Sequence, residues 1–285
     1  MTDVIKGPMW PARNLSRNTG TGSVHNDETA AELGFRGGPV RADNHMNQFV
    51  PVVLDIFGYD WFESGHLSLS FKSATLELEE VQVCAKQLEA GAKQVDVWME
   101  RDAETTVCRG TAGIGDTSQT ELRTKDIHAC DPSALRICKN LEIGMDLGTY
   151  EIELSSIEQF ERYDSGSISD PIKNYREADF FDGVVACPST YLELLWRAPT
   201  VEGLGPHLPD KFVGLFGAME ICNVNGPLFL DRIYTVTSTL VAVGESPKTE
   251  NVWHDASAFD ADGNEIANLR MMQRILKASS ELYSR

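Results

Sequence analysis

The sequence predicts an α+β protein made of two tandem copies of one domain, each a central helix wrapped by an antiparallel sheet. Landmarks of the first half return in the second half in the same order and at nearly the same offset: Val24-His25-Asn26 as Ile172-Lys173-Asn174, and Phe35-Arg36-Gly37 as Phe181-Asp182-Gly183. A repeat unit of roughly 140 residues has the size of a domain and exceeds the periods of solenoid repeats. Each half also runs from a loop through a helix into short alternating strands, as expected when a sheet covers one helix.

Later landmarks extend the repeat and set its boundaries. Gly65–Leu69 is matched by Gly226–Leu230, and Val97-Trp98 is matched by Val252-Trp253. The two tryptophans are expected to be paired core or interface residues. The predicted units are an N-terminal repeat with an irregular lead-in (1–115), a polar connection (116–140) and a C-terminal repeat (141–285).

In the first half, residues 1–22 are polar and rich in glycine and asparagine, which predicts the irregular lead-in. A short helix is expected over 27–33, followed by a glycine loop. A longer helix then begins at Asp43 or Asn44 as its N-cap, and Pro51 should bend or break it. Alternating apolar and polar residues predict half-buried antiparallel strands over 67–71, 75–78, 81–83, 95–98 and 105–113.

The second half is predicted to follow the same order. After a strand over 149–154 and a short helix near 174–180, its central helix begins at Pro188-Ser189-Thr190. Thr190 and Glu193 match a capping box. The remaining strands are expected over 212–216, 228–243, 250–259 and 265–275.

Composition restricts the classes of partner and compartment. A formal net charge of −18 disfavours nucleic acid and anionic membranes, because either would be repelled over most of the surface. No apolar run approaches the length of a membrane span, and no secretory signal is visible. The six cysteines show no CxxC spacing, which favours reduced thiols in a cytoplasm over a zinc site or a disulfide scaffold. Whether two chains pair into a homodimer is left open.

The segment from Val24 to Gly38 resembles the active-site segment of MaoC-type hydratases, which are hotdog-fold proteins. The resemblance rests on His25-Asn26, the short helix after it, and Gly34-Phe35-Arg36-Gly37 ahead of the central helix. In the second half, Asp170–Lys173 and Gly183–Ser189 are similar to the same motif in degraded form. The resemblance implies a double hotdog and a protein that acts on acyl thioesters carried on CoA or a related pantetheine, without a cofactor or a metal.

In that family an aspartate and a histidine move water and a proton across the double bond of the acyl group. The resemblance assigns His25 to the histidine position. The aspartate position falls on Gly20 or Thr21, neither of which has a carboxylate. Asp27 and Asp43 are therefore the candidate substitutes, and the simpler explanation of each is that it caps a helix. In the second half, Lys173 stands at the histidine position.

The resemblance also implies where substrate binds. Gly37 and Gly38 form the loop beside it, and the backbone N–H near Ala42 would take the developing enolate charge. Arg36 and Arg41 flank this loop and are candidates for binding an anionic group such as a CoA phosphate, with solvated surface arginine as the alternative.

The function expected from these residues is an enoyl-CoA-type hydratase or dehydratase that uses His25 with a non-standard partner. Two alternatives are a thioesterase-like hydrolase on the same fold and a non-catalytic acyl-binding or partner subunit. The fold alone does not separate the three.

Overall fold

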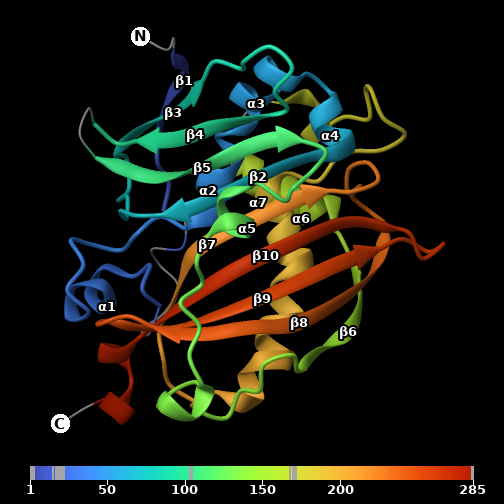
Figure 1. Cartoon of the computed structure of the whole chain (residues 1–285). Coiled ribbons are helices and arrows are strands. Elements are labelled where there is room, and N and C mark those ends of the chain that lie inside the picture. The colour runs from blue at the N-terminus through green and yellow to red at the C-terminus, as the bar shows by residue number, and fades with distance from the viewer. Residues whose placement is uncertain are drawn as a thin grey trace.

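The computed structural model describes residues 4–14, 16, 23–102, 105–166, 168 and 172–283. Within these residues ten strands form one continuous antiparallel sheet in the order β1-β3-β4-β5-β2-β7-β10-β9-β8-β6, with most of the helices on one face of it (Figure 1). The strands are β1 (Val4–Pro11), β2 (Gly65–Phe71), β3 (Glu80–Lys86), β4 (Gln94–Glu100), β5 (Thr106–Ile114), β6 (Asp146–Glu153), β7 (Gly214–Asn223), β8 (Ile233–Glu245), β9 (Thr249–Phe259) and β10 (Glu265–Leu276).

The two halves of the sheet join where β2 pairs with β7. Leu67 lies opposite Ile221 and Leu69 opposite Met219 across this seam. Outward from the seam both halves have equivalent strand orders, so β2 corresponds to β7 and β4 corresponds to β9. Trp98 and Trp253 lie on β4 and β9, as their sequence match requires. The prediction of two equivalent halves is thereby confirmed.

One landmark of the predicted repeat is wrong. The segment Gly226–Leu230 follows β7 and precedes β8, so it is not the counterpart of β2. The true counterpart begins earlier, at Gly214, and carries a different pattern. A Gly-x-Leu-x-Leu pattern is short enough to recur by chance, which is why it misled the alignment.

Seven α-helices are found in the described part of the chain. They are α1 (Asp27–Glu32), α2 (Ala42–Asn47), α3 (Val50–Phe57), α4 (Asp60–Ser64), α5 (Glu121–Thr124), α6 (Ser156–Asp164) and α7 (Pro188–Leu195). The central helix of the first half is broken into α2 and α3 just before Pro51, as a proline there leads one to expect. The two halves meet inside the sheet through α2 and α7, because Asn47 Nδ2 donates to Ser189 Oγ at 3.0 Å and Asn47 Oδ1 accepts from Ser189 N at 2.9 Å.

The core lies between these helices and the inner face of the sheet, and one buried cluster contains residues of both halves. Val53 and Leu192 contribute from the helices, and Leu69 and Met271 contribute from the strands. Each large apolar side chain buried in this way stabilises the fold by about 1.5–3 kcal/mol. The two halves therefore share their apolar core as well as their sheet.

The predicted irregular lead-in is wrong over residues 4–11, which form strand β1 and pair with β3. Pro8 falls within the register shift between Lys6 and Met9, and β1 lies at the edge of the sheet. A proline that cannot donate a hydrogen bond is tolerated at such an edge or bulge. The composition of this segment therefore did not indicate the strand.

Two other strand and helix predictions are wrong. Residues 75–78 hold no strand, because Leu76–Glu79 form a turn in which Glu79 N donates to Leu76 O at 3.2 Å and Leu78 adopts a φ of 63°. The helix expected near 174–180 is only the single 3-10 turn Lys173–Tyr175.

The helix of this region lies earlier, at α6, where Ser155 accepts a hydrogen bond from Glu158 N and caps it. Helix α7 begins at Pro188 with Cys187 as its N-cap, so the capping box predicted at Thr190 is also wrong. The Thr190 hydroxyl instead donates to Gln159 Oε1 of α6 at 2.9 Å. The Thr190 hydroxyl therefore binds a side chain of another helix instead of a backbone N–H of its own helix.

The segment predicted as a connection holds α5, which lies against the outer face of the β2–β7 seam. Thr120 Oγ1 donates to the buried Glu220 carboxylate at 2.5 Å, and Arg123 Nε donates to it at 2.7 Å. The boundaries 1–115, 116–140 and 141–285 stay a prediction. No helix among the described residues has the length and apolar character needed to cross a membrane.

Candidate active site

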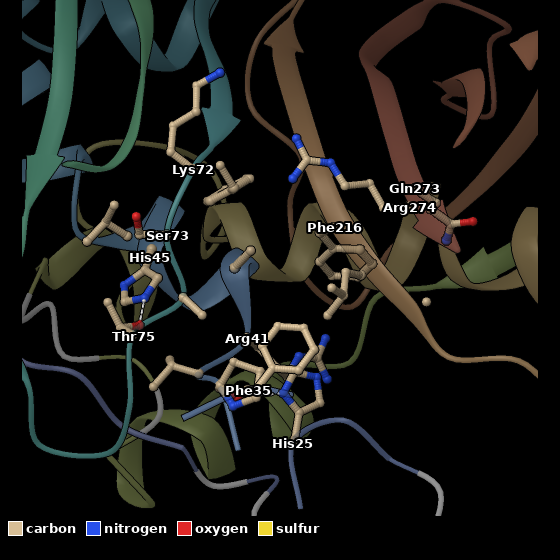
Figure 2. A pocket seen from close by; sticks show the side chains of 18 of the residues that line it. His25, Phe35, Arg41, His45, Lys72, Ser73, Thr75, Phe216, Gln273 and Arg274 are labelled. Atoms are coloured by element: carbon tan, nitrogen blue, oxygen red, sulfur yellow. Dashed lines mark hydrogen bonds between the residues drawn. The ribbon is translucent and has the colours of Figure 1, made fainter. Parts of the chain in front are cut away.

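A cavity opens where β2 and β7 separate beyond their seam. Their pairing ends at Ser70 and Ala218, and beyond it residues 71–75 and 214–216 line opposite sides of a space of about 410 Å³. Further walls come from 39–42, from the C-terminal end of α7 and from 273–275 of β10 (Figure 2). Both halves therefore contribute to one cavity.

His25 lines this cavity from the loop ahead of α1. Its Nδ1 lies 2.7 Å from the carbonyl oxygen of Pro39. Because a carbonyl oxygen only accepts, Nδ1 carries the proton and Nε2 keeps its lone pair. No hydrogen-bond partner for Nε2 is found among the described residues. The ring is thus fixed in the tautomer that a general base requires.

The glycine loop holds His25 in place through close backbone contacts. Asn14 Nδ2 donates both to His25 O at 3.0 Å and to Gly38 O at 2.9 Å. A Cβ atom on Gly38 would lie 2.1 Å from His25 O, so this approach is open only to glycine. At Gly37 the nearest atoms would be 3.5 Å away, which is ordinary contact. Of the two predicted glycines, Gly38 is the one that the geometry requires.

The surroundings of His25 favour its neutral form. Burial lowers the pKa of the imidazole, and the charge of Arg41 lowers it further, whereas the hydrogen bond to Pro39 and the charge of Asp43 act in the opposite direction. At neutral pH the ring is therefore an uncharged base facing the cavity.

Neither candidate carboxylate is free to assist His25, and neither caps a helix. Asn26 is the N-cap of α1, and Asp27 instead accepts from Gly38 N at 2.9 Å. Asp43 is buried and binds Arg41 through two hydrogen bonds, of 3.0 Å and 2.7 Å. Both capping predictions are wrong, because α1 begins one residue earlier and α2 begins two residues earlier than expected. Neither aspartate is among the residues that line the cavity.

The predicted binding residues divide into two groups. Arg41 and Ala42 line the cavity, and Ala42 is the first residue of α2. Arg36 lies outside the lining and pairs with Glu79 at 2.9 Å, with more than half of its side chain exposed. Gly20 and Thr21, where the family's aspartate would stand, lie outside the described residues.

Two cations that the sequence did not single out lie at the cavity. Lys72 follows β2 and Arg274 lies on β10, and their charged ends lie together at one end of the view in Figure 2, away from His25. Neither side chain has a hydrogen bond or ion pair within the described part of the chain. Burial lowers the pKa of both groups, and Lys72 is lowered further by Lys125, Arg109 and Arg274. Lys72 and Arg274 are thus two cationic side chains at the cavity of a chain of strongly negative net charge. They come from segments about 200 residues apart, so no local pattern could reveal them.

A second histidine, His45 of α2, also lines the cavity and is hydrogen-bonded at both nitrogens. Its Nε2 lies 2.6 Å from Thr75 Oγ1, and its Nδ1 lies 2.9 Å from Gln48 Oε1. All three side chains are buried. Sequence spacing gave no signal for this group, because Thr75 was assigned to a strand.

In the second half, the position that corresponds to His25 does not line this cavity. Lys173 is exposed and binds Asp179 at 3.0 Å. Further along the same segment, Phe181 packs its ring against those of Phe62 and Phe229, at centroid distances of 5.6 Å and 6.2 Å.

Comparison with known proteins supports the fold. No protein-family model matches the sequence, and no curated protein matches it. A solved structure named as a MaoC domain protein dehydratase, from Chloroflexus aurantiacus, is similar with a TM-score of 0.63 and 12% identity over 97% of this chain and 95% of that one.

Two further structures agree. A conserved hypothetical protein from Mycobacterium tuberculosis, described as having a double hotdog fold, gives a TM-score of 0.60 at 9% identity over 96% of each chain. A MaoC-like dehydratase gives 0.57 at 12% identity over 96% of this chain and 97% of that one. The chain is thus a double hotdog, as its sequence predicts.

Proposed function

We propose that this protein is an acyl-thioester hydratase or dehydratase of the MaoC type in which His25 acts as the acid and base without a carboxylate partner. The observation that carries this proposal is the fixed tautomer of His25, which leaves a lone pair on Nε2 of a ring that lines a cavity formed by both halves. The resemblance of the surrounding loop to the MaoC active-site segment and the similarity of the fold support it.

The reaction needs one group that first accepts a proton and then returns it. In hydration of a 2-enoyl thioester, His25 Nε2 takes a proton from water as the oxygen bonds to the β carbon. The imidazolium then gives that proton to the α carbon. Charge that develops on the thioester oxygen is stabilised by a backbone N–H of the first turn of α2, where Ala42 lines the cavity and such groups have no partner within the helix. Dehydration follows the same path in reverse.

The positions of the aspartates give them supporting roles in this scheme. Asp27 ties Gly38 to α1, and Asp43 neutralises Arg41 next to His25. Both would therefore position the histidine loop and α2 without exchanging protons with substrate.

Lys72 and Arg274 are proposed to bind the phosphates of the thioester carrier, in place of the predicted Arg36. Unpaired cations at a cavity attract an anionic ligand even when the net charge is negative, because the local field decides. The carrier would then enter between β2 and β7, with its acyl end toward His25.

The test of the chemistry is an absorbance assay with 2-enoyl-CoA thioesters of several chain lengths, following loss of the conjugated chromophore. His25→Gln is expected to lower kcat by about 100-fold or more, the usual contribution of a general acid-base group. His128→Asn, which replaces an exposed histidine, is the control and should keep wild-type turnover. Full activity of His25→Gln, or a wild type inactive on every thioester, would overturn the proposal.

The carrier site is tested by substrate truncation. Lys72→Ala and Arg274→Ala should each raise KM for the CoA thioester by about 10-fold, the value of one charge-assisted hydrogen bond. Neither should change KM for the N-acetylcysteamine thioester, which has no phosphate. Lys139→Ala, an exposed lysine elsewhere, is the control. Equal losses on both substrates would contradict the assignment.

A further inference from the structure

The hydration scheme leaves unused the hydrogen-bonded chain Thr75–His45–Gln48 in the wall of the cavity. Figure 2 shows Thr75 joined to His45 on one side of the cavity, with His25 beside Arg41 in another part of it. Thr75 Oγ1 lies 2.6 Å from His45 Nε2, and His45 Nδ1 lies 2.9 Å from Gln48 Oε1. A hydroxyl, a base and a group that orients the base are thus linked by two consecutive hydrogen bonds.

The directions of these hydrogen bonds follow from the acceptor at the far end. An amide oxygen only accepts, so Gln48 Oε1 requires the proton on His45 Nδ1. His45 Nε2 then has a lone pair, and the Thr75 hydroxyl must donate to it. This is the arrangement in which a side-chain hydroxyl is activated as a nucleophile, and it is recognised by geometry and not by sequence order.

We propose that Thr75 is a nucleophile for a second activity of this cavity, the hydrolysis of acyl thioesters through an acyl-threonine intermediate. His45 is its general base, and Gln48 is the positioning residue that holds the ring. This assignment does not depend on His25, and it acts on the carbonyl carbon instead of the double bond.

The steps balance without any further reactant than water. Thr75 Oγ1 bonds to the thioester carbonyl carbon while its proton moves to His45 Nε2. The C–S bond then breaks, and the leaving sulfur takes that proton and departs as the free thiol. Water next attacks the acyl ester and gives a proton to His45, which returns it to Oγ1 as the carboxylic acid leaves.

The environment of the chain suits this role. Burial lowers the pKa of His45, so that its ring is neutral and able to accept a proton at neutral pH. The base and the nucleophile are each less than 4% exposed, yet both line the cavity, so bulk water does not compete for their hydrogen bond. Electrostatic interactions are strengthened in such a dry site.

The experiment uses saturated acyl-CoA thioesters, which have no double bond to hydrate, so that its outcome is separate from that of the hydratase proposal. Free thiol release is followed with a chromogenic disulfide, and acid-quenched protein is analysed by intact and peptide mass spectrometry. Wild type should release thiol and carry one acyl mass on the peptide that contains Thr75.

Three variants sharpen the result. Thr75→Val keeps the shape but removes the hydroxyl, and it should lower thiol release by about 100-fold or more and abolish the acyl adduct. Thr75→Ser keeps the hydroxyl and should retain both. Thr249→Val removes a buried hydroxyl at the first residue of β9, outside the cavity lining, and should behave as wild type.

The pH profile separates catalysis from structure. Thiol release by wild type should fall as pH drops and His45 becomes protonated, whereas a purely structural threonine would give no such limb. Absence of acyl-Thr75 together with unchanged thiol release in Thr75→Val would overturn the proposal. So would a wild type that releases no thiol from any saturated thioester.

Discussion

Replacement of His254 by leucine should remove a large part of the pH dependence of folding. His254 lies on β9 between Leu240 of β8 and Met271 of β10, is fully buried, and has no hydrogen-bond partner for either ring nitrogen among the described residues. Burial lowers the pKa of His254 from 6.5 to about 4. The folded protein therefore holds this ring neutral over a range in which the unfolded chain protonates it.

The size of the effect follows from the two pKa values. At pH 5 the unfolded chain carries nearly one proton on His254, and the folded chain about a tenth of one. Integration from pH 7.5 to pH 5 gives a loss of about 2 kcal/mol in the free energy of unfolding. The sign is fixed by the lowered pKa: this stability is present above pH 6.5 and is lost as pH falls toward 4.

Urea unfolding followed by far-UV circular dichroism at pH 7.5, 6.5, 5.5 and 5.0 measures the contribution of His254. That contribution is the difference in the free energy of unfolding between wild type and His254→Leu. His25, His45 and His66 also have lowered pKa values and contribute to both curves, so they cancel in the comparison. As pH falls from 7.5 to 5.0, the free energy of unfolding of wild type should fall by about 2 kcal/mol more than that of His254→Leu. Parallel pH dependences in the two proteins would refute the reasoning.

Three further outcomes are expected. Gly38→Ala should abolish hydration, because its Cβ would displace the His25 carbonyl, whereas Gly37→Ala should fold and turn over normally; equal activities of the two variants in the chromophore assay would contradict this. Asp43→Asn should lower the free energy of unfolding by about 3 kcal/mol in urea titrations, since it leaves the largely buried Arg41 with only its longer ion pair to Glu193, at 3.6 Å; a change below 1 kcal/mol would argue against a strong pair. The acid limb of kcat should lie below the ordinary histidine pKa, because burial lowers that of His25; a limb above that value would exclude His25 as the base.

The overall fold could be predicted because the repeat and the strand alternation are properties of the chain itself. The paired Trp98 and Trp253 fell on equivalent strands, and α7 was found where apolar residues recur at helical spacing. The errors arose where tertiary contacts override local signals. Thr190 looks like a cap but binds Gln159 of another helix, and β1 is a strand only because β3 offers it an edge.

The candidate site was predictable only where its residues are local in sequence. His25, Arg41 and Ala42 belong to one short segment, and the structure places all three at the cavity. Lys72 and Arg274 could not be found in this way, because they come together only when β2 and β10 take their places in the sheet. The ion pair of Arg41 with Asp43 depends on helix geometry of a kind that a residue pattern does not specify.

The shared cavity also bears on how the chain could be divided. His25 and Lys72 come from the first half and Arg274 from the second, so each fragment of a chain cut within 116–140 would carry an incomplete set of groups. In a single chain the partner half is always present at high effective concentration. Expressed as two separate polypeptides, the halves would have to find each other before a ligand could bind, and ligand binding would become a direct reporter of their association.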